Sequence, residues 1–437
     1  MQRDESPVQR LTTTAVILAI AAAIGITSVV WGWSIQADPN VKLGAAPLVG
    51  QWRWRPSLGT LVALVVAAVL VVGLPVVAER GCFIVVVVTM GAAAALFTFV
   101  VAATDGLSHV LDPVVHPTEY WANLATLPPV GDMLRDYGTV DFLLNYSVHA
   151  KGHPPGFFLV LKGLAAVGLG APWVTGALSY IGAFVLPIAV LVTVRAVVSE
   201  PAARLTAPFL ALVPYAVWMG TSADAFYTAV CAVGIAALVV SRATVAALRR
   251  WMLGGLGGLT LAFGLFCTYG VAPLLLLPLG LLACGFRSKP RATAQTAAAA
   301  VIAALVVTTG FALNGFWWFD GANTTRQFYW WGTAQFRPGE YFVIGNLGAA
   351  LIAVGPAVVV ALARLRSRAM WALVGSALLC VIASDLSQYS KAEVERIWLL
   401  FLPWLVPCVV VLRRRTIWLT VQAATTIILQ TWLVSKW

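Results

Sequence analysis

The sequence contains long apolar runs without a single charged residue, and these runs recur along nearly the whole chain. An uncharged run of about 20 residues has the length of an α-helix that crosses the hydrocarbon core of a bilayer. Charged residues make up 10% of the chain, whereas soluble domains carry about 25%. We therefore expect an all-α, polytopic transmembrane helical bundle. The same composition excludes a soluble enzyme, a disordered chain and a nucleic-acid-binding protein.

Residues 1–437 are predicted to form one transmembrane domain with about thirteen spanning helices. The first run is too long for the apolar core of a cleaved signal peptide, so we expect it to remain as a span. The apolar run 157–169 is shorter and contains Lys162, which favours a juxtamembrane or re-entrant helix. The predicted spans are 11–33, 58–78, 83–103, 172–194, 205–219, 226–241, 251–266, 270–286, 294–313, 343–363, 369–384, 397–412 and 416–434.

Arginine is distributed unevenly between the two sets of alternating loops. Clusters such as Arg249–Arg250 and Arg413–Arg415 all fall on one side if 157–169 does not span. Lysine and arginine concentrate in cytoplasmic loops, so this side and the N-terminus are predicted to be cytoplasmic. Arginine (22 residues) far exceeds lysine (6), and alanine and valine are abundant, as in proteins from GC-rich bacteria, which favours the inner (plasma) membrane. The formal net charge of +11 is therefore a topology signal and does not indicate an anionic partner.

Most polar residues outside the cytoplasmic loops lie in large outer segments, of which 104–156 is the richest. This segment holds all four histidines of the chain, together with Asp105, Asp112 and Glu119. Its length exceeds what a connector between two spans requires. Segment 314–342 is rich in aromatic residues, which indicates either an interfacial belt or a lid over a substrate. The chain has no phosphate-binding glycine loop, dinucleotide fingerprint or HExxH helix.

No metal site is predicted. The histidines do not form a zinc motif such as HExxH, and the six cysteines lie in or beside apolar runs, where they are expected to be core residues. A divalent cation as a cofactor is left open.

An ordered set of motifs resembles the GT-C superfamily of integral-membrane glycosyltransferases, which includes protein mannosyltransferases and aminoarabinose transferases. The set begins with Thr118-Glu119-Tyr120-Trp121, in which Thr-Glu replaces the usual Asp-Glu, and continues with His153-Pro154-Pro155-Gly156. Arg195, the outer turn Ser222-Ala223-Asp224 and Glu395-Arg396 follow along the chain. Two spans precede the loop beyond the usual single span. The resemblance implies a GT-C-like bundle in which 104–156 is the extracytoplasmic catalytic loop.

The resemblance implies transfer of a hexosyl or pentosyl group from a polyprenyl-phosphate donor to a lipid or glycan acceptor of the cell envelope. The mechanism would be inverting and would use a carboxylate base. Glu119 is the first candidate for this base, Asp112 is the second, and Asp224 is a further acid of the site. The alternatives are an arginine-paired loop acid for Glu119 and a helix N-cap for Asp224.

The departing phosphate requires cations, and arginine offers two donors in a fork that fits a phosphate. Arg396 is the first candidate, and its alternatives are an ion pair with Glu393 or Glu395 or a contact with a lipid headgroup. The other candidate ligands for the donor and its phosphate are Arg326, Arg337, His153, Lys151 and Tyr120.

Two other functions remain open from the sequence. A transporter or flippase for a lipid-linked or small solute is one, although transporters typically show internal repeats and ionisable groups at mid-membrane depth. A catalytically inactive GT-C relative is the other. The outer position of the ionisable residues favours the enzyme.

Overall fold

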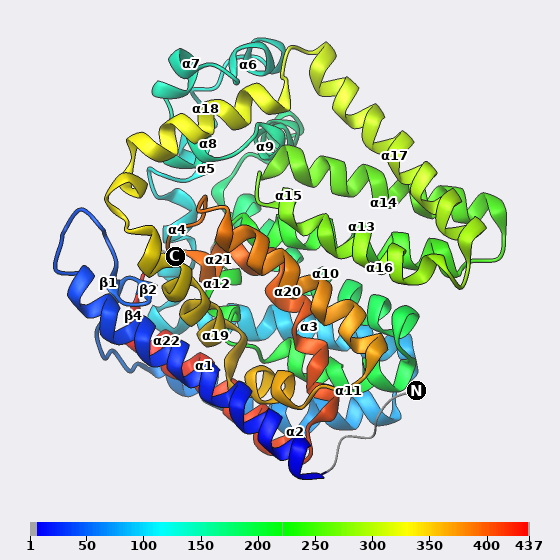
Figure 1. The fold of residues 1–437 in the computed structure, drawn as a ribbon. Coiled ribbons are helices and arrows are strands. Elements are labelled where there is room, and N and C mark those ends of the chain that lie inside the picture. Colours follow the sequence, from blue (N-terminus) through cyan, green and yellow to red (C-terminus); the bar gives the residue numbers. More distant parts are fainter. Residues whose placement is uncertain (1–6, 221, 436–437) are drawn as a thin grey trace.

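The computed structural model describes residues 7–435 except Thr221 (Figure 1). The start of the predicted cytoplasmic N-terminus and Thr221 of the outer turn lie outside the described residues. The described part of the chain is almost entirely helical, and its strands are only two residues long. The prediction of an all-α polytopic protein is thus confirmed.

Nine helices in the described residues are long and apolar enough to cross a membrane, and each coincides with a predicted span. They are α1 (Pro7–Ile35), α2 (Leu58–Arg80), α3 (Phe83–Ala102), α10 (Pro172–Val197), α13 (Asp224–Ala243), α14 (Ala247–Cys267), α17 (Pro290–Leu313), α19 (Gly339–Arg364) and α20 (Arg368–Leu386). Helix α2 exposes Leu61, Val65, Val69 and Val72 along one face. A stripe of this kind is suited to contact with lipid chains.

The other four predicted spans form shorter or broken helices. Segment 205–219 is divided between α11 (Glu200–Ala211) and α12 (Ala216–Met219), and 270–286 between α15 (Val271–Leu274) and α16 (Leu276–Phe286). Segment 397–412 follows α21 (Val394–Ile397) as three 3-10 helices. The chain bends by 65° between Val394–Leu400 and Leu402–Val411. Prolines such as Pro214 and Pro403 lie at the breaks, because proline lacks the N–H that continues a helix. Segment 416–434 forms α22 (Arg415–Trp432), which does not reach the hydropathy of the nine.

Counting the bent pair as one crossing raises the nine spanning helices of the described chain to ten. The total of about thirteen spans stays a prediction.

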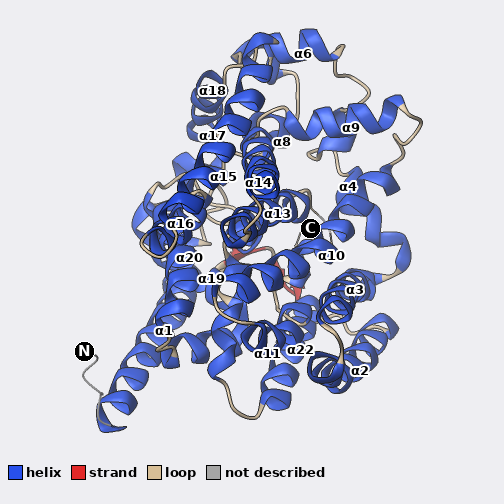
Figure 2. Cartoon of the chain, turned by 90° about the vertical axis from the view of Figure 1, so that its right-hand side faces the viewer, coloured by secondary structure: helices blue, strands red, loops and turns tan. Residues whose placement is uncertain are grey.

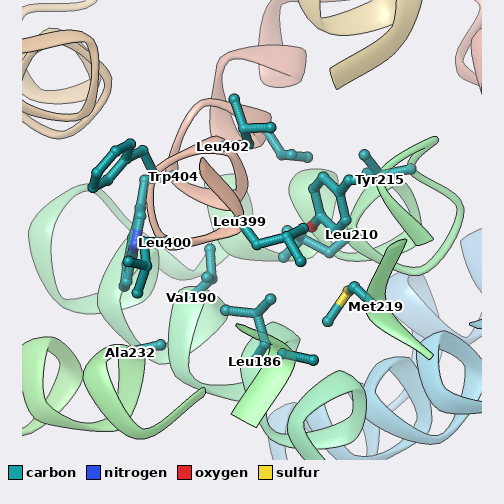
Figure 3. Close-up of a cluster of buried hydrophobic side chains, with 14 of the residues drawn as sticks. Leu186, Val190, Leu210, Tyr215, Met219, Ala232, Leu399, Leu400, Leu402 and Trp404 are labelled. Atoms are coloured by element: carbon teal, nitrogen blue, oxygen red, sulfur yellow. The ribbon is translucent and has the colours of Figure 1, made fainter. Parts of the chain in front are cut away.

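The broken segment after α21 lies in the centre of the bundle. Leu186 and Val190 of α10 belong to the same buried cluster as Leu399, Leu400 and Trp404 (Figure 3). Irregular backbone is tolerated at membrane depth when it is enclosed by protein in this way. Neighbouring helices approach closely through glycine, since a Cβ on Gly182 of α10 would clash with the Ala225 carbonyl of α13. The packing of the core therefore fixes the positions in space of the N-terminal ends of α21 and α13.

Segment 104–156 folds into short helices that gather at one end of the molecule, with α9 and α18 beside them (Figures 1 and 2). Helix α9 has 11 residues and is about 16 Å long, whereas the hydrocarbon core measures about 30 Å. It is thus too short to cross a bilayer, and its juxtamembrane position stays a prediction. The helices are α4 (Asp112–Val115), α5 (Tyr120–Asn123), α6 (Val130–Asp136), α7 (Val140–Leu144), α8 (Val148–Gly152), α9 (Gly156–Ala166) and α18 (Trp318–Trp331).

Four strands form two antiparallel pairs. Strand β1 (Gly44–Ala45) pairs with β2 (Leu48–Val49), and β3 (Gln51–Trp52) pairs with β4 (Leu433–Val434). The second pair places the segment after α1 beside the end of α22.

Candidate functional site

Ionisable side chains from distant segments meet beside the loop helices. Glu119 precedes α5, Asp224 begins α13 and Arg396 lies on α21. Their residue exposures are 8%, 4% and 5%, so all three are buried. Charged groups are costly to bury unless they are paired, which makes a cluster of this kind a candidate functional site.

Glu119 pairs with an imidazole. Its Oε1 lies 3.1 Å from Nε2 of His149 on α8. The pKa of Glu119 is raised to about 7, mainly by burial; the positive charge of Arg396 lowers it, and the negative charges of Asp224 and Glu393 raise it. Burial also holds the pKa of His149 well below its usual value, so this imidazole is neutral at pH 7. Glu119 therefore exchanges a proton near neutral pH, as a general base requires.

Asp224 forms an ion pair with Arg396. Arg396 Nη1 lies 2.5 Å from Asp224 Oδ2, and Nη2 lies 3.2 Å from Glu393 Oε2. The residue at the N-cap of α13 is Ala223, and no side chain caps that helix. The Asp224 carboxylate thus binds a guanidinium instead of capping the helix. The Glu393 contact is the ion pair that the sequence offered as an alternative role for Arg396.

Tyr120 and His153 form an aromatic wall beside the carboxylates. The buried ring of Tyr120 lies 4.9 Å from the ring of Phe157 and 5.6 Å from that of His149, with edge-on geometry in both cases. His153 stacks on His149 with ring centroids 6.0 Å apart. Burial lowers the pKa of His153 to about 4. It is therefore uncharged at neutral pH in this structure, and its role as a phosphate ligand stays a prediction.

Asn123 joins the two loop segments of the site, around Glu119 and around Ser147, by hydrogen bonds. Its Nδ2 donates to the Glu119 carbonyl at 2.7 Å and to Ser147 Oγ at 2.8 Å, and its Oδ1 accepts from the Ser147 N–H at 3.0 Å. The Pro-Pro-Gly turn then directs α9 against α14, since a Cβ on Gly156 would clash with the Phe266 carbonyl. The position of Glu119 relative to His149 thus depends on one amide side chain.

A small cavity opens beside Glu119. Its volume is about 20 Å³, enough for roughly one water molecule. Glu119, three aromatic residues and the hydroxyl-bearing residues Thr175, Ser179 and Ser222 are among those that line it. The cavity is too small for a sugar ring, so a sugar would require the loop helices to move apart.

Several predicted residues lie outside this cluster. Asp112, the first residue of α4, is exposed, and Asp105 pairs with Arg55. Arg326 is exposed on α18. The Lys151 ammonium lies 5.5 Å from the centre of the Phe328 ring.

Arg337 is buried, but its guanidinium contacts backbone carbonyl groups. It donates to the carbonyl of Val41 at 3.0 Å and to that of Lys391. These bonds join three outer segments, which is a structural role.

His149 and Asn123 join the site although the sequence did not single them out for it, whereas Glu393 was named as a possible partner of Arg396. The sequence signal for His149 was its place among the four histidines of segment 104–156. No comparable signal marked Asn123. Within the described ranges, no group of three or more His, Cys, Asp or Glu residues is arranged to hold a metal ion.

The site combines a carboxylate that titrates near pH 7, a neutral imidazole and a guanidinium held between two acids. Such a set can take a proton from a hydroxyl group and can bind an anion if one acid moves away from the guanidinium.

Comparisons with models of protein families, with curated proteins and with solved structures give no match for the chain.

Proposed function

We propose that the chain is a GT-C-type glycosyltransferase that transfers a sugar from a polyprenyl-phosphate donor to a lipid or glycan acceptor outside the cytoplasm. The supporting observation is the position of Glu119. Its carboxylate lies 3.1 Å from a neutral imidazole, and its pKa of about 7 also responds to the charge of Arg396. A base and a phosphate ligand are the two groups that this transfer requires.

In the proposed reaction, Glu119 takes the proton of the acceptor hydroxyl as that oxygen attacks the anomeric carbon. The new carbon–oxygen bond forms on the face opposite the phosphate, and the bond from the anomeric carbon to the phosphate oxygen breaks. Its electron pair leaves with polyprenyl phosphate, and the anomeric configuration inverts. His149 Nε2 lies 3.1 Å from Glu119 Oε1, which places this imidazole beside the carboxylate that takes the proton.

Arg396 is the proposed ligand of the leaving phosphate, but in the structure it contacts carboxylates. Of the two carboxylates described beside it, that of Glu393 is farther away, at 3.2 Å, and its side chain is 26% exposed, against 6% for that of Asp224. Glu393 also has a left-handed backbone with φ 62°, which is unfavourable for residues other than glycine. The phosphate therefore replaces Glu393, while Asp224 continues to orient the guanidinium.

The test uses the purified full-length protein in nanodiscs with a panel of hexosyl and pentosyl polyprenyl phosphates. We expect at least one donor to be consumed, with release of polyprenyl phosphate, and Glu119→Gln to abolish this release. Asp112→Asn is the matched control because Asp112 is an exposed acid of the same loop. In a parallel assay with sealed proteoliposomes, intact donor appearing in the opposite leaflet would instead indicate a flippase. Equal turnover by the wild type and Glu119→Gln would contradict the mechanism.

A further inference from the structure

A second cavity lies far from Glu119, at the end of the bundle that carries the predicted cytoplasmic arginines. It has a volume of about 210 Å³ and lies between α2, α11 and α22, which contact one another (Figure 2). Its inner wall is formed by Pro208, Phe209 and Leu419, all buried, and its mouth by exposed Glu79 and Arg415. The cavity thus runs from an apolar interior to a charged rim.

Proline explains why these helices leave a gap. Pro75 lies inside α2 and Pro208 inside α11, and both line the cavity. A proline ring inside a helix removes one backbone hydrogen bond and pushes against the preceding turn, which bends the helix. Both prolines lie at the same cavity, which ties the gap between these helices to the sequence.

The rim carries an excess of positive charge that the protein does not neutralise. Arg204 is fully occupied, because it pairs with Glu200 at 2.7 Å and donates to the carbonyls of Ala78 and Gly81. Arg415 and its neighbours Arg413 and Arg414 are exposed and make no side-chain hydrogen bond or ion pair within the described residues. Among the described residues, Glu79 is the one acid that lines the cavity and it offsets one arginine, so the excess of positive charge comes from Arg413 and Arg414 beside the mouth. The rim therefore complements an anion.

We infer that this cavity binds an anionic phospholipid, with the phosphodiester headgroup at Arg415 and part of an acyl chain against Phe209 and Leu419. Pockets that enclose whole small molecules measure about 300–1,000 Å³. A cavity of 210 Å³ can hold only part of a ligand, and a lipid leaves its remaining chain in the bilayer. Basic pockets between membrane helices are known to hold anionic headgroups. This inference is independent of the proposed function.

The test compares phosphatidylglycerol with phosphatidylcholine of the same acyl chains, by native mass spectrometry and thermal unfolding of the full-length protein. We expect tighter retention of phosphatidylglycerol and about fivefold weaker binding in Arg415→Gln, the effect of one basic residue near an anionic surface. Arg291→Gln is the matched control, since Arg291 is an exposed arginine away from the cavity. Leu205→Trp, or Leu205→Phe should the former not fold, fills the cavity and should abolish retention while the arginines remain.

Three outcomes would overturn the inference. Equal losses in Arg415→Gln and Arg291→Gln would show a general charge effect. Retention of phosphatidylglycerol by a folded Leu205 variant would place the lipid elsewhere. Equal stabilisation by inorganic phosphate would show a small-anion site without a lipid.

Discussion

Arg396 Nη1 lies 2.5 Å from Asp224 Oδ2, and the two side chains are each only 6% exposed. The residues are 172 positions apart, so their ion pair joins the start of α13 to α21, which leads into the broken segment at the centre of the bundle. Burying two charges is costly, and removal of one partner leaves the other without compensation. This contact therefore links the stability of the core to the chemistry proposed for the site.

The first prediction concerns this ion pair. Arg396→Ala should lower the free energy of unfolding by about 3–5 kcal/mol, because it leaves the Asp224 carboxylate buried without its partner. Arg396→Lys keeps the charge but loses the fork, so it should retain part of the stability and of the donor affinity. Chemical denaturation in detergent and a donor-binding assay measure the two effects.

Arg326→Ala is the control for Arg396, since Arg326 is an exposed arginine outside the cluster. Its effect should stay within about 0.5 kcal/mol. If Arg396→Ala changed neither stability nor donor binding, the ion pair would be unimportant for both.

The second prediction concerns the proposed base. Glu119→Gln preserves the size of the side chain but cannot accept a proton at neutral pH. Turnover should fall by at least the roughly 10²–10⁴-fold that general-base catalysis supplies. Donor affinity should change little, because the contacts of the amide are similar. Asp224→Asn should instead weaken the ion pair and lower stability and donor binding together.

Asp112→Asn should leave turnover near the wild-type value. An inactive Asp112→Asn enzyme beside an active Glu119→Gln enzyme would show that the exposed carboxylate is the base. Full activity in all three variants would remove the mechanism from this loop.

The third prediction is a pH profile. Glu119 accepts a proton only when it is ionised, and its pKa is raised to about 7. Activity should therefore fall as the pH drops below 7, well above the usual range of a glutamate. The charge of Glu393 raises the pKa of Glu119, so Glu393→Gln should move this acid limb to lower pH. An acid limb near pH 4.5 in the wild type would contradict the burial of Glu119.

Nine spans were predictable because each is an apolar run long enough to cross a bilayer by itself. The breaks in the other four segments depend on how the chain packs. Pro403 lies inside an apolar run that reads as a helix, yet the surrounding core accepts an irregular backbone there. In α22, Gln422 and Thr426 are buried polar residues that lower its hydropathy. Hydropathy alone does not reveal whether such a segment crosses.

The candidate site was predictable in part. Glu119, Asp224 and Arg396 could be proposed from their motifs, but no sequence pattern indicated that Asp224 and Arg396 would touch. Arg337 was proposed because it follows an aromatic stretch, whereas the structure turns its guanidinium toward the backbone of Val41. Such choices depend on loop packing, which brings together segments with no shared periodicity.

The last prediction concerns topology, on which the outer position of the site depends. We expect segment 104–156 to be extracytoplasmic and α9 not to cross the membrane. Cys82 and Cys284 are exposed, so both are first replaced by alanine to remove background labelling. Cysteines at the exposed loop position Ala125 and at Ala171, just before α10, should then react with a membrane-impermeant reagent from outside. A cysteine at exposed Ala246 before α14 should react only after the membrane is opened. Labelling of Ala125→Cys but not Ala171→Cys from outside would mean that the short helix crosses, and the predicted sides of every later loop would be reversed.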